Sequence, residues 1–317
     1  MRISATWMST ANPSGGLFVE DNPMTMQIEA TRFGRWQQAY RLRLGVAEMI
    51  VVTEIGPRIL SLTVGDSPNL LFVDEGLEIA RGAGDDPWRI YGGHRIWMAP
   101  ETEDAYAPDN VPCQVTVGTD ELTALAPVSP RTLLQKRLTV RARDGRFVVE
   151  QGVRNLAETV YCGAVWALTC VVPKGVVAFP WGAGGGWDVK KIMYWNRWME
   201  HRSDVASVQW QPGPDLFRVL PTGEEGKVGT NSPEGWVALC RDDATFIKSR
   251  VWAPGVDYPD DGCSLEVYTS PKFIELETLG PITTLYPGQE ITHEETWTAT
   301  SQVVDSEDGA ALRALLI

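Results

Sequence analysis

The feature that most constrains the fold of this chain is a succession of roughly fifteen short strand-like segments with almost no helical periodicity. Apolar and polar residues alternate in some segments, as at Tyr40, Leu42 and Leu44, and apolar residues run together in others. Turn residues separate the segments, and Arg143-Asp-Gly145 carries the Asp-Gly pair typical of tight β-hairpins. Strands are predicted at 40–44, 49–52, 59–62, 69–73, 113–117, 121–126, 131–142, 145–153, 161–172, 215–220, 235–241, 244–250, 264–269, 272–278 and 289–300. This pattern predicts an all-β protein built as a large antiparallel sandwich.

A single β-sandwich domain is predicted over residues 26–317, because no linker, short repeat or change of composition interrupts it. Residues 1–25 are predicted to form an irregular N-terminal segment. Residues 74–92 and 180–214 are predicted to be long loops, the second with short strands, and loops of this length are usually functional. One short C-terminal helix is predicted, with Ser306 as its cap and acidic residues in its first turn.

The composition argues against some classes of partner. The chain has 28 basic and 41 acidic residues, and its net charge of -13 repels nucleic acid. No apolar run of about 18 residues predicts a membrane-spanning helix, so no membrane partner is expected. The five cysteines lack metal-binding spacing and favour free thiols in a reducing compartment. The N-terminus lacks the apolar core of a signal peptide, and a cytoplasmic location is therefore expected. The oligomeric state is left unknown.

Motifs for common cofactors do not occur. The segment from Gly182 to Trp187 departs from GxGxxG because its sixth residue is tryptophan, and no βαβ pattern surrounds it. No GxSxG segment is present, and the residues after His293 do not form HExxH. No cofactor and no metal ion are therefore predicted. The carboxylates of Asp188, Glu275 and Glu277 leave a divalent ion open as an alternative.

Two glutamates stand out on a predicted strand. Glu275 and Glu277 are two residues apart, so they project from one face, opposite Ile274 and Leu276. A solvated surface explains such a pair, and so does a functional site. The following turn at Gly280-Pro281 is sharp enough to place Glu277 at the rim of a cleft.

Of the three histidines and Arg58, His94 and Arg58 each allow two interpretations. His94 follows Gly92-Gly93, where a flexible backbone can present a side chain to a site; the alternative is a structural histidine packed against a neighbouring tryptophan. His201 is predicted to be a solvated loop residue, and His293 lies on a late strand. Arg58 enters an apolar strand, where it either pairs with a carboxylate or binds ligand hydroxyls.

Several segments taken together resemble the galactose mutarotase-like superfamily, the aldose 1-epimerases and their relatives. Their order and spacing over residues 30–300 carry the resemblance, and a bacterial branch of mutarotase-like proteins is the most similar. The segments are Arg35-Trp-Gln-Gln-Ala-Tyr-Arg-Leu42, Gly56-Pro-Arg-Ile-Leu-Ser-Leu62, Gly92-Gly-His-Arg-Ile-Trp-Met-Ala-Pro-Glu101, Phe273-Ile-Glu-Leu-Glu277 and Leu285-Tyr-Pro-Gly-Gln-Glu290. The resemblance implies a β-supersandwich that binds a sugar.

The resemblance also implies roles for residues. In the epimerases a late glutamate takes the proton of the anomeric hydroxyl and a histidine protonates the ring oxygen, so Glu277 matches the base. The family's acid histidine lies on a central strand, but the corresponding residues 165–169 contain no histidine, and His94 is left as the candidate acid. The other residues expected at the substrate are Arg58, Arg95, Trp97, Trp166, Thr169, Trp187 and Glu275.

Three functions therefore remain open for a chain whose expected partner is a mono- or oligosaccharide. The first is a sugar epimerase that needs no cofactor. The second is a carbohydrate-binding protein without turnover. The third is a lyase or hydrolase acting on an oligosaccharide, which the four tryptophans between residues 181 and 198 favour.

Overall fold

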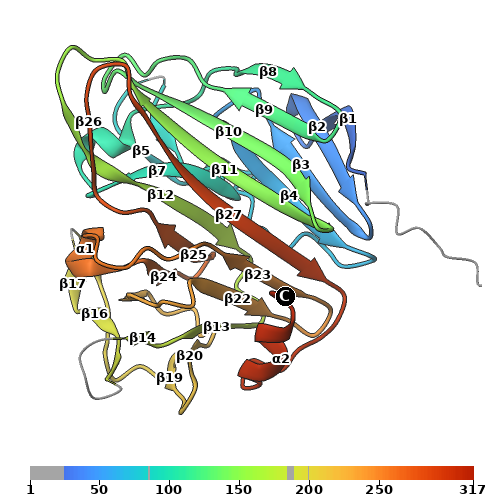
Figure 1. Ribbon diagram of the computed structural model, residues 1–317, viewed down its shortest axis with the longest axis vertical. Coiled ribbons are helices and arrows are strands. Elements are labelled where there is room, and N and C mark those ends of the chain that lie inside the picture. Colours follow the sequence, from blue (N-terminus) through green and yellow to red (C-terminus); the bar gives the residue numbers. More distant parts are fainter. Residues whose placement is uncertain (1–24, 85, 184–188, 199) are drawn as a thin grey trace, which may run out of the picture.

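The computed structural model describes residues 25–84, 86–183, 189–198 and 200–317. Within these ranges most elements are strands, which form two large antiparallel sheets, sheet I and sheet II, and three hairpins (Figure 1). The predicted all-β fold class is confirmed. In the same ranges, no helix has the length and apolar character that crossing a membrane requires.

Sheet I contains eleven of the described strands. In spatial order they are β1 (Gln27–Phe33), β2 (Trp36–Leu44), β3 (Ala47–Val52), β4 (Arg58–Val64), β7 (His94–Ala99), β12 (Tyr161–Val171), β25 (Ile274–Leu279), β24 (Leu265–Thr269), β21 (Gly226–Thr230) and β16 (Met193–Trp195), with β26 (Thr283–Leu285) paired to β12.

Sheet II contains ten of the described strands. Their order is β19 (Trp210–Pro212), β20 (Leu216–Val219), β13 (Val176–Pro180), β22 (Trp236–Cys240), β23 (Thr245–Ser249), β27 (Glu290–Thr300), β11 (Arg146–Asn155), β10 (Leu134–Arg143), β9 (Glu121–Leu125) and β8 (Gln114–Val117).

Smaller elements lie outside the two sheets. The hairpins pair β5 (Ala80–Arg81) with β6 (Trp88–Arg89), β14 (Gly182–Ala183) with β15 (Lys190–Lys191), and β17 (Arg197–Trp198) with β18 (His201–Arg202). The helical segments are the 3-10 turn η1 (Glu103–Tyr106), α1 (Pro259–Gly262) and α2 (Gly309–Ala314).

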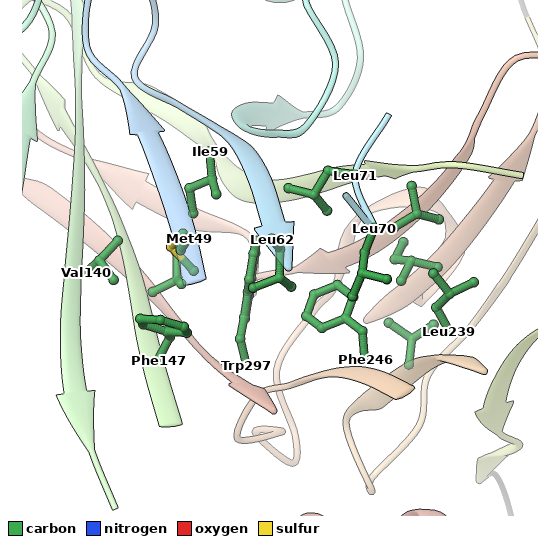
Figure 2. Close-up of a cluster of buried hydrophobic side chains, with 14 of the residues drawn as sticks. Met49, Ile59, Leu62, Leu70, Leu71, Val140, Phe147, Leu239, Phe246 and Trp297 are labelled. Atoms are coloured by element: carbon green, nitrogen blue, oxygen red, sulfur yellow. The ribbon is translucent and has the colours of Figure 1, made fainter. Parts of the chain in front are cut away.

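A hydrophobic core fills the space between the two sheets. Figure 2 shows Met49, Ile59 and Leu62 of sheet I together with Phe147 and Trp297 of sheet II. Successive residues of a strand point to opposite faces, so each strand contributes every second residue to this core. In the central strands β7 and β25, however, all six residues are buried. The face of sheet I that is turned away from sheet II must therefore be covered as well.

Many of the predicted strands appear within a few residues of their expected limits. The Asp-Gly hairpin is one of them: Asp144 and Gly145 both have positive φ, and Arg143 pairs with Arg146 across the turn. Strands β1, β13 and β21 were not predicted. Strand β21 is short, with two glycines and a lysine among its five residues, and such a composition gives little strand signal.

Two further expectations need correction. The predicted loop 74–92 contains the hairpin of β5 and β6. The C-terminal helix exists, but its cap is Asp308 and not Ser306, because the Asp308 side chain accepts a hydrogen bond from the Ala311 backbone at 2.9 Å. The irregular segment predicted at the N-terminus lies almost wholly outside the described residues.

Candidate functional site

The face of sheet I that points away from sheet II, called here the outer face, carries an apolar cluster of its own. Trp97 of β7 and Trp166 of β12 are cross-strand partners on this face. Trp88 of the β5–β6 hairpin packs edge-on against Trp97 at 5.4 Å, and the ring of Tyr106 from η1 contacts both. The hairpin and η1 therefore cover part of the outer face.

A cavity of about 420 Å³ lies over this cluster, here called the outer-face cavity. The outer face supplies its floor, and the hairpins β5–β6 and β17–β18 contribute to its walls. The lining residues that matter for its chemistry are Arg81, Arg95, Trp97, Glu101, Trp166, Trp198, Glu200, His201, Lys227, Tyr268 and Glu275. Its volume falls in the range of about 300–1,000 Å³ that is usual for small-molecule sites.

An ion pair stands in the floor of the cavity. Arg95 donates to Glu275 across β7, β12 and β25, with Nη2 at 3.0 Å from Oε1. The Cys170 thiol lies between the two and contacts the same carboxylate oxygen at 3.3 Å. The Arg95 guanidinium also lies 5.0 Å from the centre of the Trp97 ring. Glu275 is thereby held in one orientation, with 7% of its surface exposed.

A second charged group lies beside the first, and its two carboxylates are more deeply buried than Glu275. Lys227 Nζ is 2.6 Å from Glu266 and 3.5 Å from Glu277, and the Trp166 indole donates to Glu277 at 2.7 Å. Glu266 and Glu277 are cross-strand partners on β24 and β25. Lys227 lines the cavity, whereas Glu277 has no exposed surface. The prediction that Glu277 stands at a cleft rim is therefore wrong.

Burial determines the protonation of these two glutamates. It raises the pKa of Glu277 to about 7, against the opposing effect of Lys227, and the charge of Glu275 raises this pKa further. Burial also raises the pKa of Glu266 well above its ordinary value. Because Glu266 and Glu277 share one cation, Lys227, the state in which only one of the two carboxyl groups is ionised is favoured.

A histidine that the sequence pattern did not single out lies on the wall of this cavity. His201 of β18 places Nδ1 at 2.6 Å from Glu225 Oε1, and Tyr268 donates to the same oxygen at 2.8 Å. Trp198, its cross-strand partner on β17, stacks on the imidazole ring at 5.3 Å. The expectation of a solvated loop residue is wrong. The sequence did carry one signal for this hairpin: Trp198 and His201 are three residues apart, which is the spacing of two partners that flank a two-residue hairpin turn.

His94, by contrast, lies in the interior between the two sheets. It is adjacent to Arg95, so the two side chains leave β7 from opposite faces. Its imidazole is fully buried, with Nδ1 at 2.9 Å from Thr169 Oγ1 and Nε2 at 3.1 Å from the Gln151 amide. Burial lowers its pKa well below the usual value, so the ring is neutral. The expectation that His94 and Glu277 meet in one pocket is wrong, and Thr169 also faces the interior.

The remaining predicted residues divide between two places and an undescribed segment. The structure brings Arg95, Trp97, Trp166 and Glu275 together at the outer-face cavity. Arg58 does not line this cavity. Its guanidinium is buried and makes two contacts of 2.8 Å with Asp109, so of the two interpretations of Arg58 the structure shows the pairing with a carboxylate. Trp187 lies outside the described residues.

The side chains around the cavity do not suit a divalent ion. Glu275 faces Arg95, and Glu277 faces Lys227, so each carboxylate already has a cationic neighbour. Over residues 25–84, 86–183, 189–198 and 200–317, no group of three or more His, Cys, Asp or Glu side chains is arranged to hold a metal. Asp188, the third ligand considered, lies outside these ranges.

Solved structures share this architecture. No protein-family model matches the chain, and no curated protein sequence matches it. A TPR-domain containing protein from Parabacteroides distasonis matches with a TM-score of 0.57 and 12% identity over 90% of this chain, which spans 55% of that protein's length. A galactose mutarotase-like protein from Lactobacillus casei matches with a TM-score of 0.54 and 13% identity, over 82% of this chain and 99% of its own.

A galactose mutarotase related enzyme from Lactobacillus acidophilus is similar to the same degree. Its TM-score is 0.56 and its identity 10%, over 84% of this chain and 100% of its own. Likeness at such identities shows the fold, not the activity. The chain therefore has the same β-sandwich fold as these structures, which is the fold class that the sequence resemblance implied.

Proposed function

We propose that the outer-face cavity binds a sugar. Aromatic rings from three segments, Trp97, Trp166 and Trp198, line it, and flat apolar rings suit the C–H faces of a pyranose. The Arg95–Glu275 pair and Lys227 supply donors and acceptors for hydroxyl groups at the same surface. The galactose mutarotase-like fold is consistent with this class of ligand.

The chemistry proposed for this cavity is the interconversion of sugar anomers. Its main support is that a carboxylate, Glu275, and a carboxylate-oriented histidine, His201, line one cavity. Tyr268 connects the two, as the cross-strand partner of Glu275 and as a ring 5.9 Å from His201. Because Glu277 has no exposed surface, Glu275 replaces it as the proposed base.

The proton transfers follow from this arrangement. Glu275 takes the proton of the anomeric hydroxyl, while protonated His201 gives its Nε2 proton to the ring oxygen, so the C1–O5 bond breaks and an aldehyde forms. After rotation about the C1–C2 bond, the reverse proton transfers close the ring as the other anomer. They also return Glu275 and His201 to their starting protonation states. Glu225 holds Nδ1 of His201 and leaves Nε2 for the exchange. General acid and base groups contribute factors of about 10²–10⁴ each, which is sufficient because ring opening is already spontaneous in water.

Polarimetry of freshly dissolved α-D-glucose and α-D-galactose tests the proposal. The wild-type protein is expected to accelerate the decay of optical rotation for at least one sugar, and Glu275→Gln is expected to return the rate to that of buffer. Glu158→Gln is the matched control, since Glu158 is an exposed glutamate outside the lining of the cavity. If Glu275→Gln matches the wild type, Glu275 is not the base.

Two other outcomes correspond to the alternative functions. Saccharide-dependent quenching of tryptophan fluorescence with no effect on any anomer rate indicates a binding protein without turnover. A new product from an oligosaccharide panel indicates a lyase or hydrolase. Either result would overturn the epimerase assignment while keeping the sugar-binding cavity.

A further inference from the structure

A second cavity, of about 370 Å³, lies at one end of the sandwich and shares no lining residue with the first. Met98 of sheet I and Leu134 and Lys136 of sheet II form its inner side, and loops 100–111 and 126–133 form the rest. Much of the wall is apolar, with prolines at positions 100, 108, 127 and 130. It is called here the end cavity.

Lys136 is the unusual residue in this wall. Leu134 and Leu138, two residues before and after it on β10, have side chains in the core between the sheets. Alternate residues of a strand share a face, so Lys136 also points inward. Its side chain is only partly exposed, and it lines the end cavity. Its amine lies 5.8 Å from the centre of the Trp97 ring. A lysine amine thus faces an apolar space from inside the fold.

The acidic residues of the same wall are already paired with other cations. Both carboxylate oxygens of Asp109 contact Arg58 at 2.8 Å, and Asp104 accepts from Arg131 at 2.8 Å. Among the described residues, no carboxylate lies within ion-pair distance of Lys136. The other polar groups of the lining are the Thr102, Ser129, Thr132 and Tyr161 hydroxyls and the Cys162 thiol. Protonated hydroxyl and thiol groups are uncharged, so none of these groups offers Lys136 an anionic partner.

The charge state of Lys136 reflects this lack of a partner. Burial lowers the pKa of Lys136 to about 8, Asp109 acts in the opposite direction, and Arg58 and Arg95 lower it further. Below that pH the amine is charged in a partly dehydrated place without an anion. An unpaired charge in such a place is unfavourable, and an anionic partner would relieve it.

We propose that the end cavity binds a small monocarboxylate with an apolar body, whose carboxylate pairs with Lys136 and whose body packs against the proline-rich wall. One unpaired cation fits one negative charge. The prolines and aliphatic side chains of the wall offer apolar contact to a ring-sized body, and the volume accommodates one.

Site-resolved methylation of the full-length protein tests this site, with benzoate as the probe. Formaldehyde and cyanoborohydride methylate neutral amines, and mass spectrometry of peptides gives the rate at each lysine. With benzoate at about four times a dissociation constant in the millimolar range, methylation of Lys136 is expected to slow about fivefold. The rate at exposed Lys174 is expected to stay unchanged.

Benzamide is the control ligand, since it has the same ring without the charge. The proposal requires benzoate to protect Lys136 and benzamide not to do so. Equal protection by both ligands, or protection by neither, would overturn it.

A variant gives an independent measurement. Lys136→Met keeps the length and apolar stem of the side chain, and benzoate binding, followed by saturation-transfer NMR, is expected to weaken about tenfold or more. Lys174→Met is the matched control. For the wild type, affinity is expected to fall about tenfold for each pH unit above 8, because the protonated amine is the form that binds. Unchanged affinity in Lys136→Met would refute the site even if methylation is slowed.

Discussion

Replacing Glu277 by glutamine isolates the energetic effect of one buried carboxylate. The glutamine would keep the size of the side chain and an oxygen able to accept from the Trp166 indole, which now donates at 2.7 Å. Lys227 would keep its closer partner, Glu266, at 2.6 Å. The substitution therefore removes a titrating group and its 3.5 Å ion pair with Lys227, and it keeps the two closer contacts.

The size of the effect follows from the pKa. Burial raises the pKa of Glu277 from 4.5 to about 7. At about 1.4 kcal/mol per pKa unit, this shift corresponds to about 3 kcal/mol. Because the folded-state pKa is the higher one, the stability linked to this proton is fully present below pH 4.5 and is lost as the pH rises to 7. Glu277→Gln does not undergo this loss.

The prediction concerns the difference in unfolding free energy between Glu277→Gln and wild type. This difference is expected to be near zero at about pH 4 and to rise in favour of the variant by about 3 kcal/mol by about pH 8. Glu266 adds to it in the same direction, because burial raises its pKa and the charge of Glu277, which the variant lacks, raises this pKa further. Urea denaturation followed by circular dichroism at several pH values measures it. A difference that does not change with pH, or a variant less stable than wild type at the alkaline end, would refute the reasoning.

Three further predictions concern other parts of the chain. Asp308→Ala removes the cap of α2 and is expected to lower the unfolding free energy, measured by urea denaturation, by about 0.5–2 kcal/mol. An unchanged free energy would mean that the side-chain cap does not stabilise the helix. Arg58→Met leaves Asp109 without its partner and is expected to cost about 3–5 kcal/mol, measured in the same way, whereas a neutral result would contradict a tight ion pair. Trp198→Ala removes the ring stacked on His201 and is expected to weaken sugar binding about tenfold in a fluorescence titration, and unchanged affinity would exclude that wall from the site.

The strands were largely predictable because their signals are local. Alternation and turn residues placed β10 and β11 within three residues of their limits, and the Asp-Gly pair predicted the hairpin between them. The shared face of Glu275 and Glu277 was also a local inference, because a separation of two residues fixes it in a strand.

The side of the sheet that each strand residue faces was not predictable. Both faces of β7 are buried, so its apolar pattern does not show that Arg95 faces the cavity while His94 faces the interior. A shift of strand register by one residue moves every side chain of the strand to the opposite face of the sheet. The sequence alone therefore could not decide which of the two adjacent residues belongs to the site.

The histidine of the site was missed for a different reason. His201 belongs to a short hairpin, and its role depends on contacts with Glu225 and Tyr268, which are distant in sequence. Lys227 likewise gains its partners only when β21 pairs with β24. Such contacts arise from the packing of segments on sheet I, and local patterns carry no information about them.

The exchange of sugar anomers at equilibrium tests the central claim most directly. Two-dimensional exchange NMR of glucose or galactose measures the rate between α and β forms without a starting imbalance. The wild type and Glu158→Gln are expected to raise this rate above buffer, and His201→Gln is expected to abolish the increase, because glutamine retains a hydrogen bond to Glu225 but cannot deliver the proton. An exchange rate in His201→Gln equal to that of the wild type would contradict the proposed site.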